Sequence, residues 1–119
     1  MSQDWGFGMS ACWGDLDRDG NMDLYISSMF SGAGNLLIPR SNFNPSMAEQ
    51  TRQRYLKMVR GNSLMRNNGS GGFSDVTSPM DEGYAGWAWG AGLGDFNNDG
   101  WEDLYVANGY ISQPKKDDL

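Results

Sequence analysis

An acidic loop motif occurs twice in this chain, each time followed by the same strand-like segment. The stretch WGDLDRDGNMDLYIS at residues 13–27 aligns without gaps to LGDFNNDGWEDLYVA at residues 93–107. Just upstream, FGMSAC at 7–12 and WAWGAG at 87–92 share a mixture of small and aromatic residues. Internal repeats are typical of folds that are built from one supersecondary unit used several times. We therefore expect both copies to share one local structure.

The segments around the loops have strand patterns. Residues 7–14 and 86–94 combine Gly, Ala and aromatic side chains, which predicts close-packed inner strands. DLYISS and DLYVAN alternate aliphatic residues with tyrosine, as half-buried strands do. SLMR at 63–66 and GFSDVT at 72–77 predict two more strands, joined by a turn at NNGSG. Four strands per repeat is the organisation of a propeller blade.

One helical stretch is expected, NPSMAEQTRQRYLKMVR at 44–60, within an insert at 30–60. Asn44 or Ser46 can cap its start, and Gly61 can take the position after its last turn. Its apolar side chains fall roughly on one face of the helix: Met47, Tyr55, Met58 and Val59. Two basic side chains, Arg52 and Lys57, lie elsewhere. The expected fold class is all-β, a β-propeller segment of about one and a half four-stranded blades with a helical insert near 44–60.

The acids of the chain are concentrated in the two loops. The 119 residues carry 15 acids against 9 Lys and Arg, a formal net charge of −6. Eight of the acids, seven aspartates and Glu102, lie in DLDRDGNMD at 15–23 and DFNNDGWED at 95–103 together with one base, Arg18, so the remainder has 7 acids against 8 bases. Like charges this close together repel one another unless a cation lies among them.

Composition excludes several other classes of function. The acidic balance disfavours a nucleic-acid-binding surface. There is no histidine, which excludes His-based catalysis and His zinc sites. Cys12 stands alone, so the chain has no internal disulfide, and we expect it to be a small buried residue. No long apolar run is present, so no membrane span is expected.

The loops match the needs of a hard cation such as Ca²⁺, which takes about six to eight oxygen ligands. Asp-x-Asp-x-Asp-Gly presents oxygens at alternate residues, and Gly20 and Gly100 permit a sharp turn with positive φ. The predicted ligands of the first site are Asp15, Asp17, Asp19 and Asp23 with the carbonyl of Asn21; those of the second are Asp95, Asn97, Asp99 and Asp103 with the carbonyl of Trp101. Two Ca²⁺ sites are expected, the second weaker because Asn97 supplies an amide instead of a carboxylate.

Two other interpretations of the loops were weighed. An EF-hand needs a bidentate Glu at the twelfth position, where this chain has Ile26 or Val106, and it needs flanking helices instead of strands. The other interpretation of each loop is an acidic Asp/Asn/Gly turn with solvated carboxylates, which is disfavoured even for one copy of the motif. Two copies in register, each leading into the same strand, favour metal binding.

The loop sequences carry a family resemblance. GDLDRDGNMDLYIS and GDFNNDGWEDLYVANG resemble the calcium-loop motif of FG-GAP/VCBS repeats, the blades of integrin-α-like β-propellers. NSLMRNNGSGGFSDVT followed by GWAWGAGLGDFNNDG is similar, more narrowly, to secreted ASPIC/UnbV-type proteins related to cartilage acidic protein. The resemblance covers about residues 5–29 and 61–110. It implies a propeller of about seven blades, calcium in blade-edge loops, and an extracellular, periplasmic or cell-surface location.

The resemblance also implies an organisation and partners. Residues 1–119 are expected to be a fragment of one propeller domain, with repeat 1 at about 5–80 and the start of repeat 2 at about 84–111. One and a half blades cannot close a ring, so the remaining blades or an oligomer should cover the open strand edges. Residues 1–10 have neither the basic nor the apolar region of a secretory signal peptide.

Three classes of function remain. The favoured one is a calcium-binding, non-catalytic propeller repeat region that presents an extracellular surface for contact with a protein or glycan. The alternative is a propeller appendage of a secreted enzyme, such as a polysaccharide-degrading one, whose catalytic domain lies outside this chain. An enzyme in its own right is disfavoured, because the clustered carboxylates are better used as metal ligands.

Two surface features have alternative interpretations. Four tryptophans can stack on sugar rings: Trp13, Trp87, Trp89 and Trp101. The favoured interpretation is that most of them fill the spaces between blades, and Trp101 is the best candidate for exposure. The basic helical insert can bind an acidic partner, but a solvated helix face is favoured.

Overall fold

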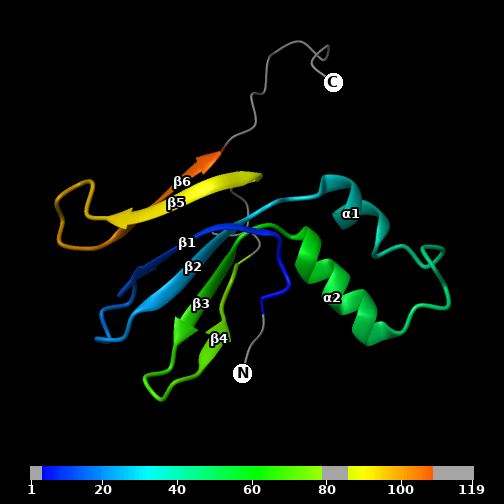
Figure 1. The fold of residues 1–119 in the computed structure, drawn as a ribbon, viewed down its shortest axis with the longest axis horizontal. Coiled ribbons are helices and arrows are strands. Elements are labelled where there is room, and N and C mark those ends of the chain that lie inside the picture. Colours follow the sequence, from blue (N-terminus) through cyan, green and yellow to red (C-terminus); the bar gives the residue numbers. More distant parts are fainter. Residues whose placement is uncertain (1–3, 79–85, 109–119) are drawn as a thin grey trace, which may run out of the picture.

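The computed structural model describes residues 4–78 and 86–108 and has a mostly β architecture (Figure 1). Six strands and two helices follow one another in these residues: β1 (Gly8–Gly14), β2 (Asp23–Ser28), α1 (Gly32–Leu37), α2 (Glu49–Val59), β3 (Ser63–Asn67), β4 (Phe73–Asp75), β5 (Ala88–Gly94) and β6 (Asp103–Asn108).

The strands form one four-stranded and one two-stranded antiparallel sheet. The first sheet has the order β1-β2-β3-β4, and the second pairs β5 with β6. The prediction of about one and a half blades is therefore confirmed in the residues described. The outer limits of the two predicted repeats, at 79–80, 84–85 and 109–111, lie outside those residues.

The turn between β3 and β4 forms at the predicted NNGSG segment. Asn68 pairs with Gly72 across the turn, its backbone N–H donating to the Gly72 carbonyl at 3.0 Å. Its side-chain Oδ1 accepts hydrogen bonds from the backbone N–H groups of Ser70 and Gly72, at 3.0 and 2.9 Å. Gly69 and Gly71 have φ of 69° and 83°, a conformation that glycine adopts without a Cβ penalty.

The two sheets contact each other through small and polar residues of β1, β2 and β5. The backbone N–H of Ala91 donates to Ser10 Oγ at 3.0 Å, and Ser10 Oγ lies 3.0 Å from Ser27 Oγ. A Cβ added to Gly14 would lie 2.5 Å from Leu93 Cδ1 and 2.2 Å from Glu102 Oε2. The prediction of a close-packed inner strand therefore holds for β1.

The same prediction is wrong for the glycines of β5. A Cβ added to Gly90 or Gly92 would have no atom within 4 Å. The described residues therefore leave open space at Gly90 and Gly92, whereas Ala88 of the same strand is buried. The crowding expected from the repeat pattern is present in only one of its two copies.

The core of the described residues is small. Four hydrophobic residues are buried, Tyr25, Ile38, Met65 and Ala88, together with several serines. Tyr25 of β2 is fully buried, whereas Tyr105, at the matching position of β6, is 62% exposed. The difference follows from pairing, because β2 lies between β1 and β3 while β6 pairs only with β5. The second sheet is thus a partial blade with an open edge.

Most of the tryptophans lie nearer the surface than the sequence predicted. Trp13 packs edge-on against Phe73, with ring centroids 6.0 Å apart, yet about half of its surface stays exposed. Trp89 is similarly exposed, so neither ring is covered by the strands that the structure describes, and the prediction that they fill the spaces between blades stays a prediction. The exposure predicted for Trp101 is confirmed. Cys12, expected to be buried, is half-buried.

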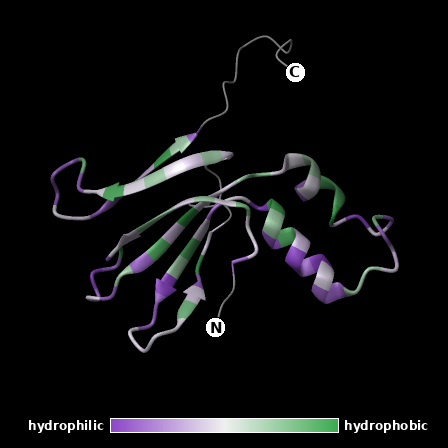
Figure 2. Cartoon of the chain, viewed as in Figure 1, coloured by the Kyte–Doolittle hydropathy of each residue, from purple (hydrophilic) through white to green (hydrophobic). Residues whose placement is uncertain are grey.

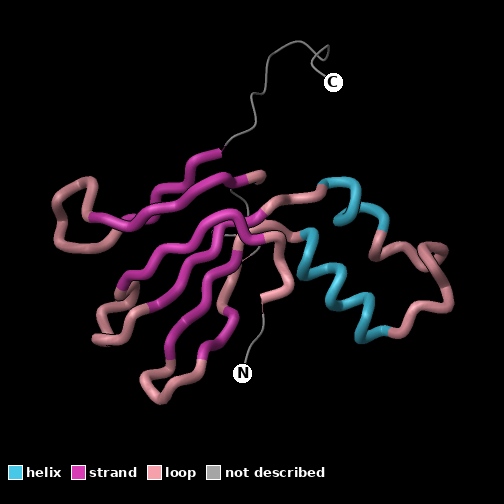
Figure 3. The backbone as a smooth tube through the Cα atoms, viewed as in Figure 1, coloured by secondary structure: helices cyan, strands magenta, loops and turns pink. Residues whose placement is uncertain are grey.

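The helices form the insert between β2 and β3 and project away from the sheets, at the end opposite the loops (Figures 1 and 3). Helix α1 was not expected, because two of its six residues are glycines. It is held by local and long-range hydrogen bonds: Ser31 Oγ accepts from Gly34 N–H at 3.1 Å, and Asn35 Nδ2 donates to the Val59 carbonyl at 2.6 Å. The prediction of a single helical stretch is therefore wrong.

Helix α2 lies within the predicted span but differs at its start and on its inner face. Its N-cap is Ala48, with no side-chain cap, so the capping predicted for Asn44 or Ser46 is wrong. Arg52 is directed inward and donates to the carbonyls of Ile38 and Phe43, while Tyr55 is exposed. The predicted apolar face is thus only partly correct, because the loop before the helix supplies carbonyls that bind the arginine.

The end of α2 agrees with prediction, since Gly61 has a φ of 101°. The helix is tied to the sheet at this end by Asp75, whose Oδ2 lies 2.9 Å from Arg60 Nη2 and 3.4 Å from Lys57 Nζ. Among the residues that the structure describes, neither helix has the length and apolar character needed to cross a membrane.

Candidate metal centre

The two acidic loops connect β1 to β2 and β5 to β6, and hydrophilic residues gather in both (Figure 2). Both loops lie at the end of the sheets where the β3–β4 turn also lies (Figure 1). Gly20 and Gly100 have φ of 86° and 85°, as predicted. Arg18 and Asn98 also have positive φ, 61° in each case, which the sequence did not reveal. The matching angles show that the repeated sequence folds into the same backbone turn twice.

Side-chain oxygens hold this turn by the same three hydrogen bonds in each loop. The residues at the first, third and fifth positions accept from backbone N–H groups two to five residues further on. In the first loop these bonds are Gly20 N–H to Asp15 Oδ2 at 3.0 Å, Asp19 N–H to Asp17 Oδ1 at 3.2 Å, and Asn21 N–H to Asp19 Oδ1 at 2.8 Å. In the second they are Gly100 N–H to Asp95 Oδ2 at 2.8 Å, Asp99 N–H to Asn97 Oδ1 at 2.9 Å, and Trp101 N–H to Asp99 Oδ1 at 2.8 Å.

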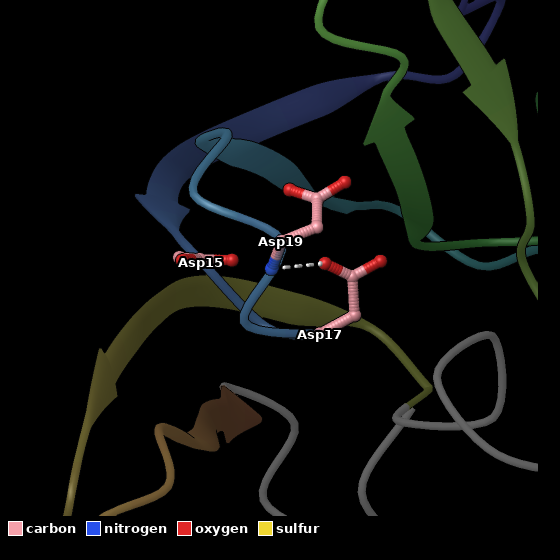
Figure 4. A group of neighbouring side chains, drawn as sticks. All are labelled: Asp15, Asp17 and Asp19. Carbon is pink, nitrogen blue, oxygen red and sulfur yellow. Dashed lines mark hydrogen bonds between the residues drawn. The ribbon is translucent and has the colours of Figure 1, made fainter.

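Three carboxylates come together in the first loop. One oxygen each of Asp15, Asp17 and Asp19 lies within 4.8 Å of the others (Figure 4). Oxygens that bind one Ca²⁺ at about 2.3–2.6 Å are separated by up to about 5 Å, so this spacing suits a shared cation. Three of the predicted ligands of the first site are thereby placed together.

Two oxygens in this group are buried: Asp15 Oδ1 has no hydrogen-bond partner among the described residues, and Asp17 Oδ2 is in an ion pair with Arg66. A buried carboxylate oxygen without a donor is costly, and a cation removes that cost. The oxygen-only donor set also matches the hard cations, Ca²⁺ above all, and lacks the nitrogen or sulfur ligands that zinc prefers. The residues present therefore fit the cation that the loop motif implies.

The other two predicted ligands of the first site have different surroundings. Asp23 is buried and outside the group of three; its Oδ1 accepts from the backbone N–H of Asn67 at 2.8 Å. Asn67 Nδ2 in turn donates to the Met22 carbonyl at 3.0 Å. Asn21 donates from its backbone and from Nδ2 to Asp19 Oδ1. Asp23 thus attaches the end of the loop to the β3–β4 hairpin.

The second loop uses its oxygens differently. Asp95 accepts with both oxygens, from Asp99 N–H and Gly100 N–H. Asp99 Oδ2 accepts from the amide of Asn97 at 3.0 Å, a bond that a carboxylate at 97 could not make. Asp103 Oδ2 accepts from Phe96 N–H at 3.1 Å. The amide therefore replaces a negative charge and also occupies an oxygen of its neighbour.

Two arginines contact the loops, and sequence reasoning missed both. Arg66 of β3 forms an ion pair with Asp17 Oδ2. Arg18 of the first loop donates to the Gly100 carbonyl and lies over the Trp101 ring, 4.4 Å from its centroid. Arg18 therefore connects the two loops. Neither contact has a local sequence signal, because each depends on how separate strands pack.

A groove of about 340 Å³ opens beside the first loop, on the side of β3 and β4. The groove is lined by three aliphatic side chains, Leu16, Leu64 and Val76, and by three charged ones, Asp17, Asp23 and Arg66. Asp17 is thus shared between the loop and the groove. Arg66 lies at the same boundary.

Two ionisable groups away from the loops have shifted pKa values. Burial raises the pKa of the Cys12 thiol, and the nearby negative charge of Glu102 raises it further. For Asp75, burial acts to raise the pKa, but hydrogen bonds from Thr77 and Arg60 and the positive charge of Arg60 outweigh it and lower the pKa. Asp75 is therefore held as a carboxylate in an ion-pair network, a structural role.

The fold and the loops define a class, a mostly β chain with partial propeller blades and an acidic loop at a blade edge. Residues 56–106 match the family of FG-GAP-like repeats. The match begins within α2 and runs through β3, β4, β5 and the second loop into β6, so this part of the chain is similar to an FG-GAP-like repeat. No curated protein and no solved structure shows significant similarity to the chain.

Proposed function

We propose that this chain is a calcium-binding, non-catalytic propeller repeat region whose first loop binds Ca²⁺ and whose second loop binds it more weakly. The observation that supports the proposal most is the group of three carboxylates at Asp15, Asp17 and Asp19, in which the buried Asp15 Oδ1 has no hydrogen-bond partner among the described residues. The FG-GAP-like repeat at 56–106 is consistent with it.

Within this proposal, Ca²⁺ supplies positive charge that offsets the repulsion between the carboxylates. Asp15, Asp17 and Asp19 would hold it, each while one of its oxygens keeps a loop N–H in place. The loop joins β1 to β2, so ordering the loop stabilises the antiparallel pair. Binding free energy then becomes folding free energy.

We further propose that the weaker site belongs to the second loop. Asn97 removes one carboxylate, and Asp95 and Asp99 already accept hydrogen bonds with both of their oxygens. A cation there has fewer charges to bind and more internal bonds to displace. We propose an extracellular or cell-surface setting for both loops, in which sites typically bind Ca²⁺ with Kd of about 10⁻⁴–10⁻³ M.

The proposed role in that setting is to present a contact surface for a protein or glycan. Three tryptophans with about half of their surface exposed support this role: Trp13, Trp89 and Trp101. Aromatic side chains supply large contact areas at protein interfaces and suit the C–H faces of sugars. The open edge of β6 is a second place where further strands can add.

Thermal unfolding in millimolar CaCl₂ and in EDTA tests the proposal. We expect Ca²⁺ at about 10 mM to raise the Tm by several degrees, since a ligand at about 10 to 100 times its Kd stabilises by about 1.4 to 2.7 kcal/mol. Asp19→Ala should remove most of the increase and Asp99→Ala a smaller part. Arg40→Gln, a change at an exposed residue of the insert, serves as the control. Equal Tm values with and without Ca²⁺ would contradict the proposal.

A further inference from the structure

Arg66 occupies an oxygen that the proposed Ca²⁺ site needs. Its guanidinium forms an ion pair with Asp17 Oδ2, an oxygen that is shielded from solvent. The other oxygen of Asp17 accepts the N–H of Asp19 and is part of the turn. Any cation that binds at Asp17 therefore meets Arg66 first.

The second loop has no comparable contact. Residues 86–108 contain neither Lys nor Arg. The one arginine that reaches this loop from elsewhere in the described residues, Arg18, donates to a backbone carbonyl and stacks on Trp101 instead of pairing with a carboxylate. Among the residues that the structure describes, a basic side chain paired with a predicted ligand thus occurs in the first loop and not in the second.

Arg66 also has space to withdraw. Its side chain is 53% exposed, and it lines the groove of about 340 Å³ beside the loop together with Leu64 and Val76. A guanidinium on a long, half-exposed side chain can move into such a groove while the strand stays in place. Displacement of Arg66 from Asp17 therefore requires no change in the β2–β3 pairing.

We infer that Arg66 is a built-in competitor of Ca²⁺ at Asp17. Without metal it neutralises one carboxylate and stabilises the loop; when Ca²⁺ binds, Arg66 leaves Asp17 Oδ2. This inference rests on the proposed calcium binding of the first loop. It means that the extra carboxylate of this loop is partly offset by Arg66, so that the two loops differ less in affinity than their ligands alone indicate.

The competition predicts a gain of affinity when Arg66 is removed. Arg66→Gln in the full chain should tighten Ca²⁺ binding at the first loop about two- to fivefold at low ionic strength, the size expected for a half-exposed ion pair. Arg66→Lys should give a value between wild type and Arg66→Gln, because a lysine keeps the charge but not the planar fork. Arg40→Gln changes the net charge equally at an exposed insert residue and should leave the affinity within about 1.5-fold of wild type.

A double-mutant cycle separates direct competition from a general effect of charge. Asp17→Asn gives the first loop the amide that the second loop has at Asn97, and it removes the carboxylate that Arg66 contacts. In the Asp17→Asn background, Arg66→Gln should therefore change the affinity by less than about 1.5-fold.

The experiment is a CaCl₂ titration followed by ¹H–¹⁵N NMR at the Gly20 amide, which donates to Asp15 and reports on the first loop alone. Circular dichroism of each variant confirms that it is folded. Tighter binding in Arg66→Gln that disappears in the Asp17→Asn background supports the inference, as does binding that appears only after Arg66 is replaced. Binding in wild type that Arg66→Gln leaves unchanged or weakens refutes the inference but not the proposed function. A Gly20 amide that does not respond to Ca²⁺ in wild type or in Arg66→Gln refutes both.

Discussion

The matched tyrosines of the two repeats offer a sharp test of the fold. Tyr25 and Tyr105 follow the same Asp-Leu in β2 and β6, but Tyr25 is fully buried and Tyr105 is 62% exposed. Replacing a fully buried aromatic residue by alanine costs about 3–5 kcal/mol. Domains of this length are stable by about 6–18 kcal/mol, so Tyr25→Ala removes a large part of the free energy of unfolding.

Tyr105→Ala should cost much less. Tyr105 has an edge-on contact with Phe96, with ring centroids 6.1 Å apart, and aromatic pairs of this kind contribute about 0.5–1.5 kcal/mol. Urea unfolding in the presence of CaCl₂, followed by circular dichroism, measures both variants. The m value shows whether the unfolded or native state has also changed. Equal losses of stability in the two variants would refute the conclusion that the first blade is complete and the second is open.

Three further predictions concern single side chains. Asp75→Asn should lower stability at pH 7 by about 1–3 kcal/mol, because Asp75 accepts hydrogen bonds from Arg60 and Thr77. Since folding lowers the pKa of Asp75, the stability that its carboxylate contributes is present above the unfolded pKa of about 3.9 and is lost as the pH falls through the folded pKa. The Tm values of the wild type and of Asp75→Asn should therefore converge in acid. A constant difference between the two Tm values down to about pH 2 would contradict this. Cys12 should react slowly with a disulfide reagent at pH 8, because burial and the charge of Glu102 raise the pKa of its thiol. Glu102→Gln should speed the reaction only slightly, since burial is the larger cause. A reaction rate equal to that of the urea-unfolded chain would disprove the raised pKa. Gly20→Ala should cost about 1–2 kcal/mol through backbone strain at its positive φ, whereas Gly90→Ala, which has open space and no such φ, should be near neutral; similar Tm values for the two would rule out the strained turn.

Features that depend on nearby residues could be predicted from the sequence. The Asp/Asn/Gly pattern of the loops determines both turns, since its side chains bind N–H groups two to five residues away. The Asn68-Gly69 turn and the strands on either side formed as predicted for the same reason. The loop pattern predicted four carboxylates at the first site, and three of them, Asp15, Asp17 and Asp19, lie close together while Asp23 is outside the group.

Features that depend on contacts between distant segments could not be predicted. Helix α1 contains two glycines and is held partly by a hydrogen bond from Asn35 to the end of α2. Arg52 is directed inward because carbonyls of the preceding loop lie there. Arg66 reaches Asp17 only because β3 pairs with β2, a pairing that no local pattern specifies. In each case tertiary contacts determine the role of a residue whose own propensity is neutral or contrary.

The burial of equivalent residues shows the same limit. The repeat predicts one environment for both copies, yet Tyr25 and Tyr105 differ because only β2 has a third strand beside it. Trp13 and Trp89 are likewise exposed where a complete set of blades was expected to cover them. Sequence similarity between repeats therefore predicts backbone conformation better than it predicts burial.

The central claim, that the acidic loops bind Ca²⁺, is tested most directly by ¹H–¹⁵N NMR of the wild-type chain during a CaCl₂ titration. The amides of Gly20 and Gly100 each donate to the first Asp of their own loop, so they report on the two sites separately. We expect both resonances to shift and to saturate at millimolar Ca²⁺, Gly20 before Gly100, and we expect Asp19→Ala to abolish the shift of Gly20 while that of Gly100 remains. Resonances that stay in place up to 10 mM Ca²⁺, about ten times the weakest expected Kd, would contradict the claim.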